Sequence, residues 1–147
     1  MSNTNIFKQF NNSIANLVAK SAVGGTLALV ARLFASAIFI IAGYGKLGAG
    51  YAGTQGYMAA MGVPGAMLPL VIALELGGGI ALLLGFQTRL VAFLLAGFSI
   101  VAGLIFHSGA DQMQQIMLMK NFAMAGGLLA FTMFGAGRLS LDGEPQN

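Results

Sequence analysis

The chain has 147 residues, of which 57% are hydrophobic and only 7% are charged. Its mean hydropathy of +0.83 is too high for a soluble globular protein, because so few charged groups cannot cover a surface of this size. The composition therefore predicts an integral membrane protein. The net charge of +3 comes from lysines and arginines scattered along the chain, a pattern that predicts no nucleic acid partner.

The inventory of ligating residues is small. The sequence has no cysteine and one histidine, which excludes disulfides, thiolate catalysis, iron–sulfur clusters and bis-histidine haem ligation. No glycine-rich fingerprint for flavin or nicotinamide phosphates follows a strand. We therefore predict no haem, flavin or metal, and any redox role requires a bound carrier or a partner protein.

Residues 1–21 are predicted to form an amphipathic N-terminal interfacial segment. Apolar residues recur there at helical spacing among polar ones, as in helices that lie in the membrane interface; they are Ile6, Phe7, Phe10, Ile14, Leu17 and Val18. A cleaved signal peptide is the alternative interpretation. It is disfavoured because the apolar run that follows is too long and contains Arg32.

Four apolar runs follow, each of roughly 18 to 22 residues, close to the length that crosses a hydrocarbon core. They are Thr26–Gly45, Met67–Phe86, Leu90–Phe106 and Ile116–Phe134. The predicted fold is all-α, an integral membrane four-helix bundle over residues 22–142, with a C-terminal tail at 143–147. Small residues spaced four apart, such as the pairs Gly77/Ala81, Ala123/Gly127 and Gly126/Ala130, predict close helix packing and favour a homo-oligomer.

The segment Gly48–Gly65 separates the first two runs. Thr54 as a cap and Gly62-Val63-Pro64 as a stop predict a short helix through Tyr57, Met58 and Met61. This helix is either a lid over a site or a plain interfacial segment.

Basic residues outside the apolar runs predict the orientation. With four membrane crossings, Lys8, Lys20, Arg89 and Arg138 fall on one side, and Lys46 and Lys120 on the other. The positive-inside rule then places both termini in the cytoplasm.

Two charged residues lie within the apolar runs, Arg32 in the first and Glu75 in the second. Charges at membrane depth are costly, so they usually face the bundle interior and mark function. Helical rise places both near one depth, and we predict an ion pair between them. Polar residues gather near the outer ends of the helices above this pair: Lys46, His107, Lys120 and Asn121.

Each of these residues also has a purely structural explanation. The Arg32–Glu75 pair could only lock two helices in register, and Lys46 and Lys120 could extend to lipid headgroups. His107 could be an interfacial anchor, and Asn121 could hydrogen-bond between helices. Their joint location in one half of the bundle favours a site.

These residues, in this order, resemble a known family. The resemblance covers about Ala31 to Asp142 and includes Arg32, Gly43-Tyr44-Gly45-Lys46-Leu47, Tyr57-Met58, Gly62-Val63-Pro64, Glu75, Gly78-Gly79, Leu84-Gly85, Arg89, His107, Lys120-Asn121 and Gly126-Gly127-Leu128. The sequence is similar to the DoxX family of small bacterial membrane proteins.

The resemblance implies a four-helix protein of the bacterial inner membrane that is connected with redox chemistry. A related family supplies a subunit of thiosulfate:quinone oxidoreductase, and some members are linked with superoxide dismutase and sulfurtransferase-like partners in oxidative-stress defence. The positions that match the family pattern are Arg32, Lys46, Glu75, His107, Lys120 and Asn121.

The first functional hypothesis is a quinone-interacting subunit that works with a partner oxidoreductase. His107, Lys120 and Asn121 are candidate donors to the quinone carbonyls, with Lys46 as a further ligand-binding residue. Glu75 is the candidate proton relay, and Arg32 would set its pKa. A non-enzymatic membrane anchor for soluble redox enzymes is the alternative. A carrier of small solutes or anions is disfavoured, because the chain shows no inverted repeat.

Overall fold

The computed structural model describes residues 4–20 and 22–143, which are almost entirely helical and contain no strand. Its elements in chain order are α1 (Thr4–Lys20), α2 (Ala22–Gly45), α3 (Gly50–Ala60), the 3-10 turn η1 (Gly65–Met67), α4 (Leu68–Ile72), the π-helical turn η2 (Ala73–Gly77), α5 (Gly78–Leu84), α6 (Thr88–Phe106) and α7 (Gln112–Phe134). The predicted all-α membrane architecture is confirmed.

Within the described residues, four helical segments are long and apolar enough to cross a membrane: Ala22–Gly45, Gly65–Leu84, Thr88–Phe106 and Gln112–Phe134. They match the four predicted runs, but each begins two to four residues earlier than the sequence predicted. The last helix begins early because Asp111 caps it, accepting a hydrogen bond from the Gln114 amide at 3.1 Å. Hydropathy alone does not detect such polar first turns.

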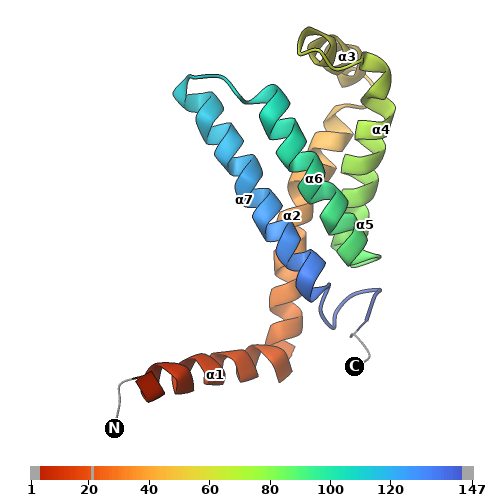
Figure 1. The fold of residues 1–147 in the computed structure, drawn as a ribbon. Coiled ribbons are helices and arrows are strands. Elements are labelled where there is room, and N and C mark those ends of the chain that lie inside the picture. Colours follow the sequence, from red (N-terminus) through yellow and green to blue (C-terminus); the bar gives the residue numbers. More distant parts are fainter. Residues whose placement is uncertain (1–3, 21, 144–147) are drawn as a thin grey trace.

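The bundle is built from two helix pairs (Figure 1). One is α2 packed along α5 and η2, and the other is α6 packed along α7. A cluster of buried apolar side chains joins the pairs; its members are Phe39, Leu82, Ala92, Leu95, Ala96, Ala125 and Leu128. A second cluster of Met58, Leu68 and Ile72 packs α3 onto α4. We call the half of the bundle that carries α3 the α3 half, and the opposite end, next to α1, the terminal end.

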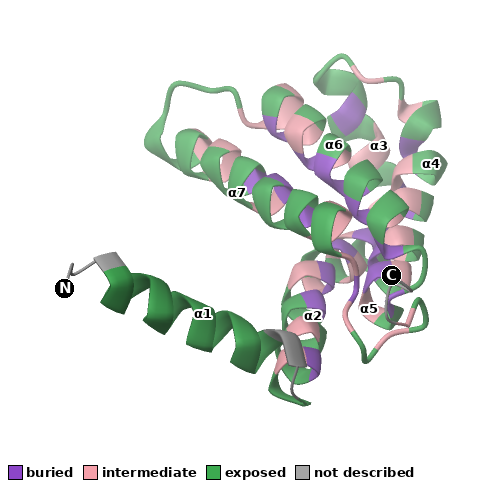
Figure 2. Cartoon of the chain, turned by 60° about the horizontal axis from the view of Figure 1, so that its bottom comes forward, coloured by how far each residue is buried: buried purple, intermediate pink, exposed green. Residues whose placement is uncertain are grey.

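The N-terminal helix α1 extends sideways from the terminal end of the bundle (Figure 1), and Figure 2 shows it exposed along its described length. Its apolar side chains Ile6, Phe7 and Phe10 are exposed by 66%, 74% and 68%. The predicted amphipathic helix is therefore present, and its direction fits a helix in the plane of a membrane interface. Residue 21, the predicted end of this segment, lies outside the described residues.

The segment between α2 and α4 contains the predicted short helix, α3, which ends at Ala60 before the Gly62-Val63-Pro64 stop. The prediction that Thr54 caps this helix is wrong. Thr54 lies within α3, where its hydroxyl donates to the Gly50 carbonyl at 2.8 Å. Helix α3 starts at Gly50, earlier than predicted, because Gly48, with φ of +54°, lets the chain turn directly after α2.

The glycines that bring helices together are not the predicted ones. A side chain at Gly77, Gly126 or Gly127 would meet no described atom within 4 Å. Close approach occurs instead at Gly43, where an added Cβ would lie 2.7 Å from the Leu76 amide nitrogen. The pairs based on Gly77, Gly126 and Gly127 therefore do not pack helices within this chain, and self-association stays a prediction.

Candidate functional site

A cavity of about 410 Å³ opens between the two helix pairs in the α3 half of the bundle. Its walls are mainly apolar side chains of α2, α4 and α6, and α3 contributes Thr54, Tyr57 and Met58. Five of the six predicted site residues line it: Lys46, Glu75, His107, Lys120 and Asn121. The sequence therefore predicted most of the polar lining, and Arg32 is the exception.

The charged pair in the cavity is Lys46 with Glu75. The Lys46 Nζ lies 2.7 Å from the Glu75 Oε2, and the two side chains are 21% and 7% exposed. Lys46 Nζ also donates to the Ala42 carbonyl at 3.2 Å. No hydrogen bond among the described residues reaches the other carboxylate oxygen, Glu75 Oε1.

The backbone that carries Glu75 is a π-helical turn, η2. A π turn inserts one residue into a helix and changes which face the following side chains occupy, and such turns occur frequently at functional sites. Gly43 permits this arrangement, because any larger residue there would collide with Leu76 in the turn. The close contact sets η2 directly against α2, one turn before Lys46.

At the mouth of the cavity, His107 lies at the C-terminal end of α6, and its amide donates to the Gly103 carbonyl at 2.9 Å. Its ring Nδ1 is 2.9 Å from the Oε1 of Gln114, in the first turn of α7. Gln114 is not among the site residues predicted from the sequence. The signal was available, since Asp111 followed three residues later by Gln114 fits the pattern of a helix N-terminus.

The other two polar residues come from α7. Asn121 is 9% exposed, and its Nδ2 donates to the Met117 carbonyl at 2.9 Å. It packs on Gly103 of α6, where an added Cβ would lie 2.9 Å from the Asn121 Cβ. Lys120 is exposed and its Nζ lies 3.3 Å from the Met117 sulfur, a weak acceptor. Lys120 is thus the cation of the cavity with the weakest protein contact.

Helix α3 covers part of the cavity. The Tyr57 ring stacks on Phe106 of α6, with centroids 5.5 Å apart and an interplanar angle of 26°. This contact links α3 to the second helix pair, so α3 forms part of the cavity wall. Of the two interpretations left open by the sequence, a cover over the site agrees with these contacts.

The predicted ion pair between Arg32 and Glu75 is wrong. The Arg32 side chain is 1% exposed and donates from Nη1 to the Leu83 carbonyl at 3.0 Å and from Nη2 to the Leu139 carbonyl. Leu83 lies in the last turn of α5, where backbone carbonyls lack partners within the helix. Because side chains of a helix point toward its N-terminus, Arg32 extends to the terminal end, away from Glu75.

Arg32 thus fastens the segment after α7 to the bundle. In this segment the amides of Leu141 and Asp142 donate to the carbonyls of Leu84 and Gly85 at 3.1 and 2.8 Å. Gly85 has φ of +68°, and a side chain there would overlap the Arg32 guanidinium. We call this arrangement of Arg32, the end of α5 and residues 139–142 the C-terminal clasp.

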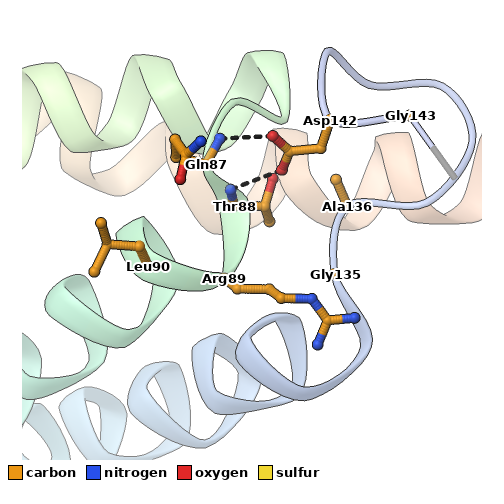
Figure 3. Close-up of a pocket in the computed structure, with 8 residues that line it drawn as sticks. All are labelled: Gln87, Thr88, Arg89, Leu90, Gly135, Ala136, Asp142 and Gly143. Atoms are coloured by element: carbon orange, nitrogen blue, oxygen red, sulfur yellow. Dashed lines mark hydrogen bonds between the residues drawn. The ribbon is translucent and has the colours of Figure 1, made fainter. Parts of the chain in front are cut away.

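A smaller cavity of about 310 Å³ lies beside the clasp, between the start of α6 and the segment after α7 (Figure 3). Asp142 accepts hydrogen bonds from the amides of Gln87 and Thr88 at 2.7 and 2.8 Å, so it caps α6 from a distant part of the chain. Arg89 points toward Gly135 and donates to the carbonyls of Thr132 and Met133 at 3.1 and 2.5 Å. These hydrogen bonds pair backbone groups at the start of α6 and at the end of α7. The polar residues that line this cavity therefore have a structural role.

The Asp142 cap predicts a pH-dependent stability. Burial acts to raise the pKa of Asp142, but hydrogen bonds from Thr88 and Gln87 and the positive charge of Arg32 lower the pKa overall. Stabilisation by the cap is therefore complete above the unfolded pKa of about 3.9 and is lost as the pH falls through the lower folded pKa. Asparagine is uncharged and has a single acceptor oxygen, so it can satisfy only one of the two amides, and Asp142→Asn should cost about 1 to 2 kcal/mol at neutral pH.

The measurement is the unfolding midpoint in detergent of the wild type and of Asp142→Asn, from neutral pH into acid. We expect the difference between the two proteins to shrink as the wild-type carboxylate is protonated. A difference that stays constant into strong acid would contradict a cap that depends on the carboxylate charge.

Comparison with known proteins agrees with this architecture. The family model for DoxX matches residues 27–108. The chain is 52% identical over 115 residues to the inner membrane protein YqjF of Escherichia coli (strain K12), covering 78% of this chain and 88% of that protein. It is 36% identical over 124 residues to the inner membrane protein YphA of the same organism, covering 79% and 88%.

No solved structure is significantly similar to the chain. The family match covers α2 to the end of α6 and includes Arg32, Lys46, Glu75 and His107, and the two relatives are inner membrane proteins. Together with the four apolar helices, these matches show that the chain is a membrane protein of the DoxX family.

Proposed function

We propose that the 410 Å³ cavity binds the head group of a quinone, and that the protein is the quinone-interacting membrane subunit of a partner oxidoreductase. The observation that carries the proposal is the meeting of the Lys46–Glu75 pair, His107, Lys120 and Asn121 in one mainly apolar cavity. Ligand pockets have volumes of roughly 300 to 1,000 Å³, with apolar walls and a few polar groups that orient the ligand. A substituted aromatic ring with an apolar tail fits this description.

The proton chemistry centres on Glu75. Reduction of a quinone to a quinol takes up electrons and protons in equal number, and a partner oxidoreductase supplies the electrons. Glu75 is the acidic residue of the cavity and lies in an ion pair with Lys46, so it is the candidate relay that delivers the protons. Arg32 has no part in this step, because its contacts lie in the C-terminal clasp.

The distribution of basic residues supports one orientation of the bundle in the membrane. Lys8, Lys20, Arg89 and Arg138 belong to segments at the terminal end, whereas Lys46 and Lys120 belong to the α3 half. This distribution supports a cytoplasmic location for both termini. The cavity then opens in the outer half of the bilayer, where a quinone enters from the lipid.

Native mass spectrometry of the protein extracted from its own membrane tests the proposal. We expect a quinone to co-purify with the wild type, and Glu75→Gln and Lys120→Ala to lower its occupancy by raising the Kd about tenfold, which corresponds to about 1.4 kcal/mol of binding free energy. Lys8→Ala in α1 lies outside the cavity and should retain the quinone.

Other outcomes would support a different function. Co-purification of phospholipids or soluble redox proteins alone, unchanged by Glu75→Gln and Lys120→Ala, would favour the membrane anchor. Flux of a small anion into proteoliposomes that depends on Lys120 would favour a carrier.

A further inference from the structure

Several hydrogen-bond acceptors of the cavity have no partner among the described residues. Two groups that could donate to a ligand carbonyl already have partners within the protein, although each keeps one N–H open. The Lys46 ammonium contacts Glu75 Oε2 at 2.7 Å and the Ala42 carbonyl at 3.2 Å, and the Asn121 amide nitrogen donates to the Met117 carbonyl at 2.9 Å. Two oxygens beside these contacts, Glu75 Oε1 and Asn121 Oδ1, receive no hydrogen bond from the described residues.

The tautomer of His107 adds a third acceptor. The oxygen of the Gln114 amide accepts hydrogen bonds but cannot donate one, so the contact of 2.9 Å between His107 Nδ1 and Gln114 Oε1 requires a proton on Nδ1. In the neutral imidazole the proton on Nδ1 leaves Nε2 without one, and Nε2 is then an acceptor. None of the hydrogen bonds among the described residues involves Nε2.

Both ends of this contact are held in place. The His107 backbone closes α6 by its bond to Gly103, and the Gln114 backbone is fixed by the Asp111 cap of α7. The ring and the amide therefore meet because two consecutive helices end and begin at these residues. Gln114 does not line the cavity, so it acts on a ligand only through the orientation and tautomer of His107.

We infer that the cavity recognises a hydroxyl group on an aromatic ring, as in a quinol or a phenol, and that Gln114 is a positioning residue that holds His107 Nε2 as the acceptor. The inference rests on the proposed function in taking a quinone-type ring as the ligand. It names the reduced, hydroxyl-bearing form as the one that binds more tightly. A hydroxyl group donates to one of these acceptors, whereas a carbonyl cannot donate and leaves His107 Nε2 unpaired, which costs free energy.

The location of Lys120 agrees with this assignment. Among the described residues its one hydrogen-bond contact is a thioether sulfur. The oxygen of a hydroxyl group can accept from Lys120 while the hydroxyl proton is donated to an acceptor. One ring hydroxyl can therefore accept from Lys120 and donate to an acceptor of the cavity at the same time. The mainly apolar walls lower the local dielectric, which strengthens both hydrogen bonds.

The first test needs no ligand. The chain has a single histidine, so nitrogen-15 labelling of histidine gives ring signals from His107 alone. In alkaline buffer we expect the chemical shifts of a protonated Nδ1 and an unprotonated Nε2. Gln114→Leu should give a mixture of tautomers, and Gln115→Leu should leave the spectrum of the wild type unchanged, since Gln115 donates to the Ala110 carbonyl instead.

The second test compares two ligands that differ by one donor, an alkylphenol and its methyl ether. We expect the wild type to bind the phenol about tenfold more tightly, as for one hydrogen bond to a strong acceptor. Gln114→Leu should reduce this preference to less than about threefold, and Gln115→Leu should preserve it.

The outcomes separate this inference from the proposed function. A proton on Nε2 in the wild type, or equal binding of phenol and ether, overturns hydroxyl recognition even if a quinone co-purifies. Failure of any quinone to co-purify overturns the proposed function, while the nitrogen-15 spectrum still decides whether Gln114 sets the tautomer.

Discussion

Replacing Arg32 with methionine is expected to lower the free energy of unfolding by about 3 kcal/mol. The side chain is 1% exposed, and its guanidinium donates to the carbonyls of Leu83 and Leu139. Methionine fills a similar volume but cannot donate, so both carbonyls lose a charge-assisted hydrogen bond worth about 1.5 to 3 kcal/mol each. Relief from burying a charge offsets part of this loss. The C-terminal clasp should open as a consequence.

The measurement is unfolding in mixed micelles, with hydrogen exchange of the Leu141 and Asp142 amides as a local readout. Both amides donate to backbone carbonyls at the end of α5 and should exchange faster in Arg32→Met. Lys8→Met, at an exposed position of α1, is the control and should stay within about 0.5 kcal/mol of the wild type. A stable Arg32→Met variant that loses quinone binding would contradict the clasp and return Arg32 to the site.

Much of the fold could be predicted from the sequence because the membrane restricts the choices. Four apolar runs of spanning length must be helices, since backbone groups in lipid need partners within the same segment. The periodic apolar residues before the first run predicted α1 as a helix. The structure confirms these elements and changes their boundaries by a few residues, mainly where a polar first turn such as Gln112–Gln115 precedes the apolar run.

The candidate site could be predicted in part. Lys46 and His107 lie at helix ends, and Lys120 and Asn121 lie in the first half of α7, so counting residues along straight helices placed them in the same half of the bundle. The partner of Glu75 could not be found in this way. An ideal helix ignores the π turn at η2, and the direction of the Arg32 side chain depends on the carbonyls of Leu83 and Leu139 at the terminal end. Residue 139 meets Arg32 only because the chain folds back after α7, which no periodicity indicates.

The second large effect concerns the charged pair in the cavity. We expect Lys46→Met to cost about 3 kcal/mol and Glu75→Leu about 2 kcal/mol, because each leaves an unpaired charge in a mainly apolar space. The loss should be greater without Lys46, since the Glu75 side chain is 7% exposed and the Lys46 side chain is 21% exposed. An unpaired lysine can extend its ammonium toward water or headgroups, whereas the short carboxylate on η2 cannot.

The double variant Lys46→Met/Glu75→Leu removes both charges and should recover about 2 kcal/mol relative to the sum of the single losses. Unfolding in mixed micelles measures this coupling, and the combination of Lys8→Met with Glu75→Leu, which joins distant residues, should be additive. Simple additivity of Lys46→Met and Glu75→Leu would contradict the ion pair. Lys46 would then have all its protons free for a ligand carbonyl, and the preference of the site for a hydroxyl group would lose one of its supports. The coupling energy therefore bears on the stability of the cavity and on the form of the ligand that it holds.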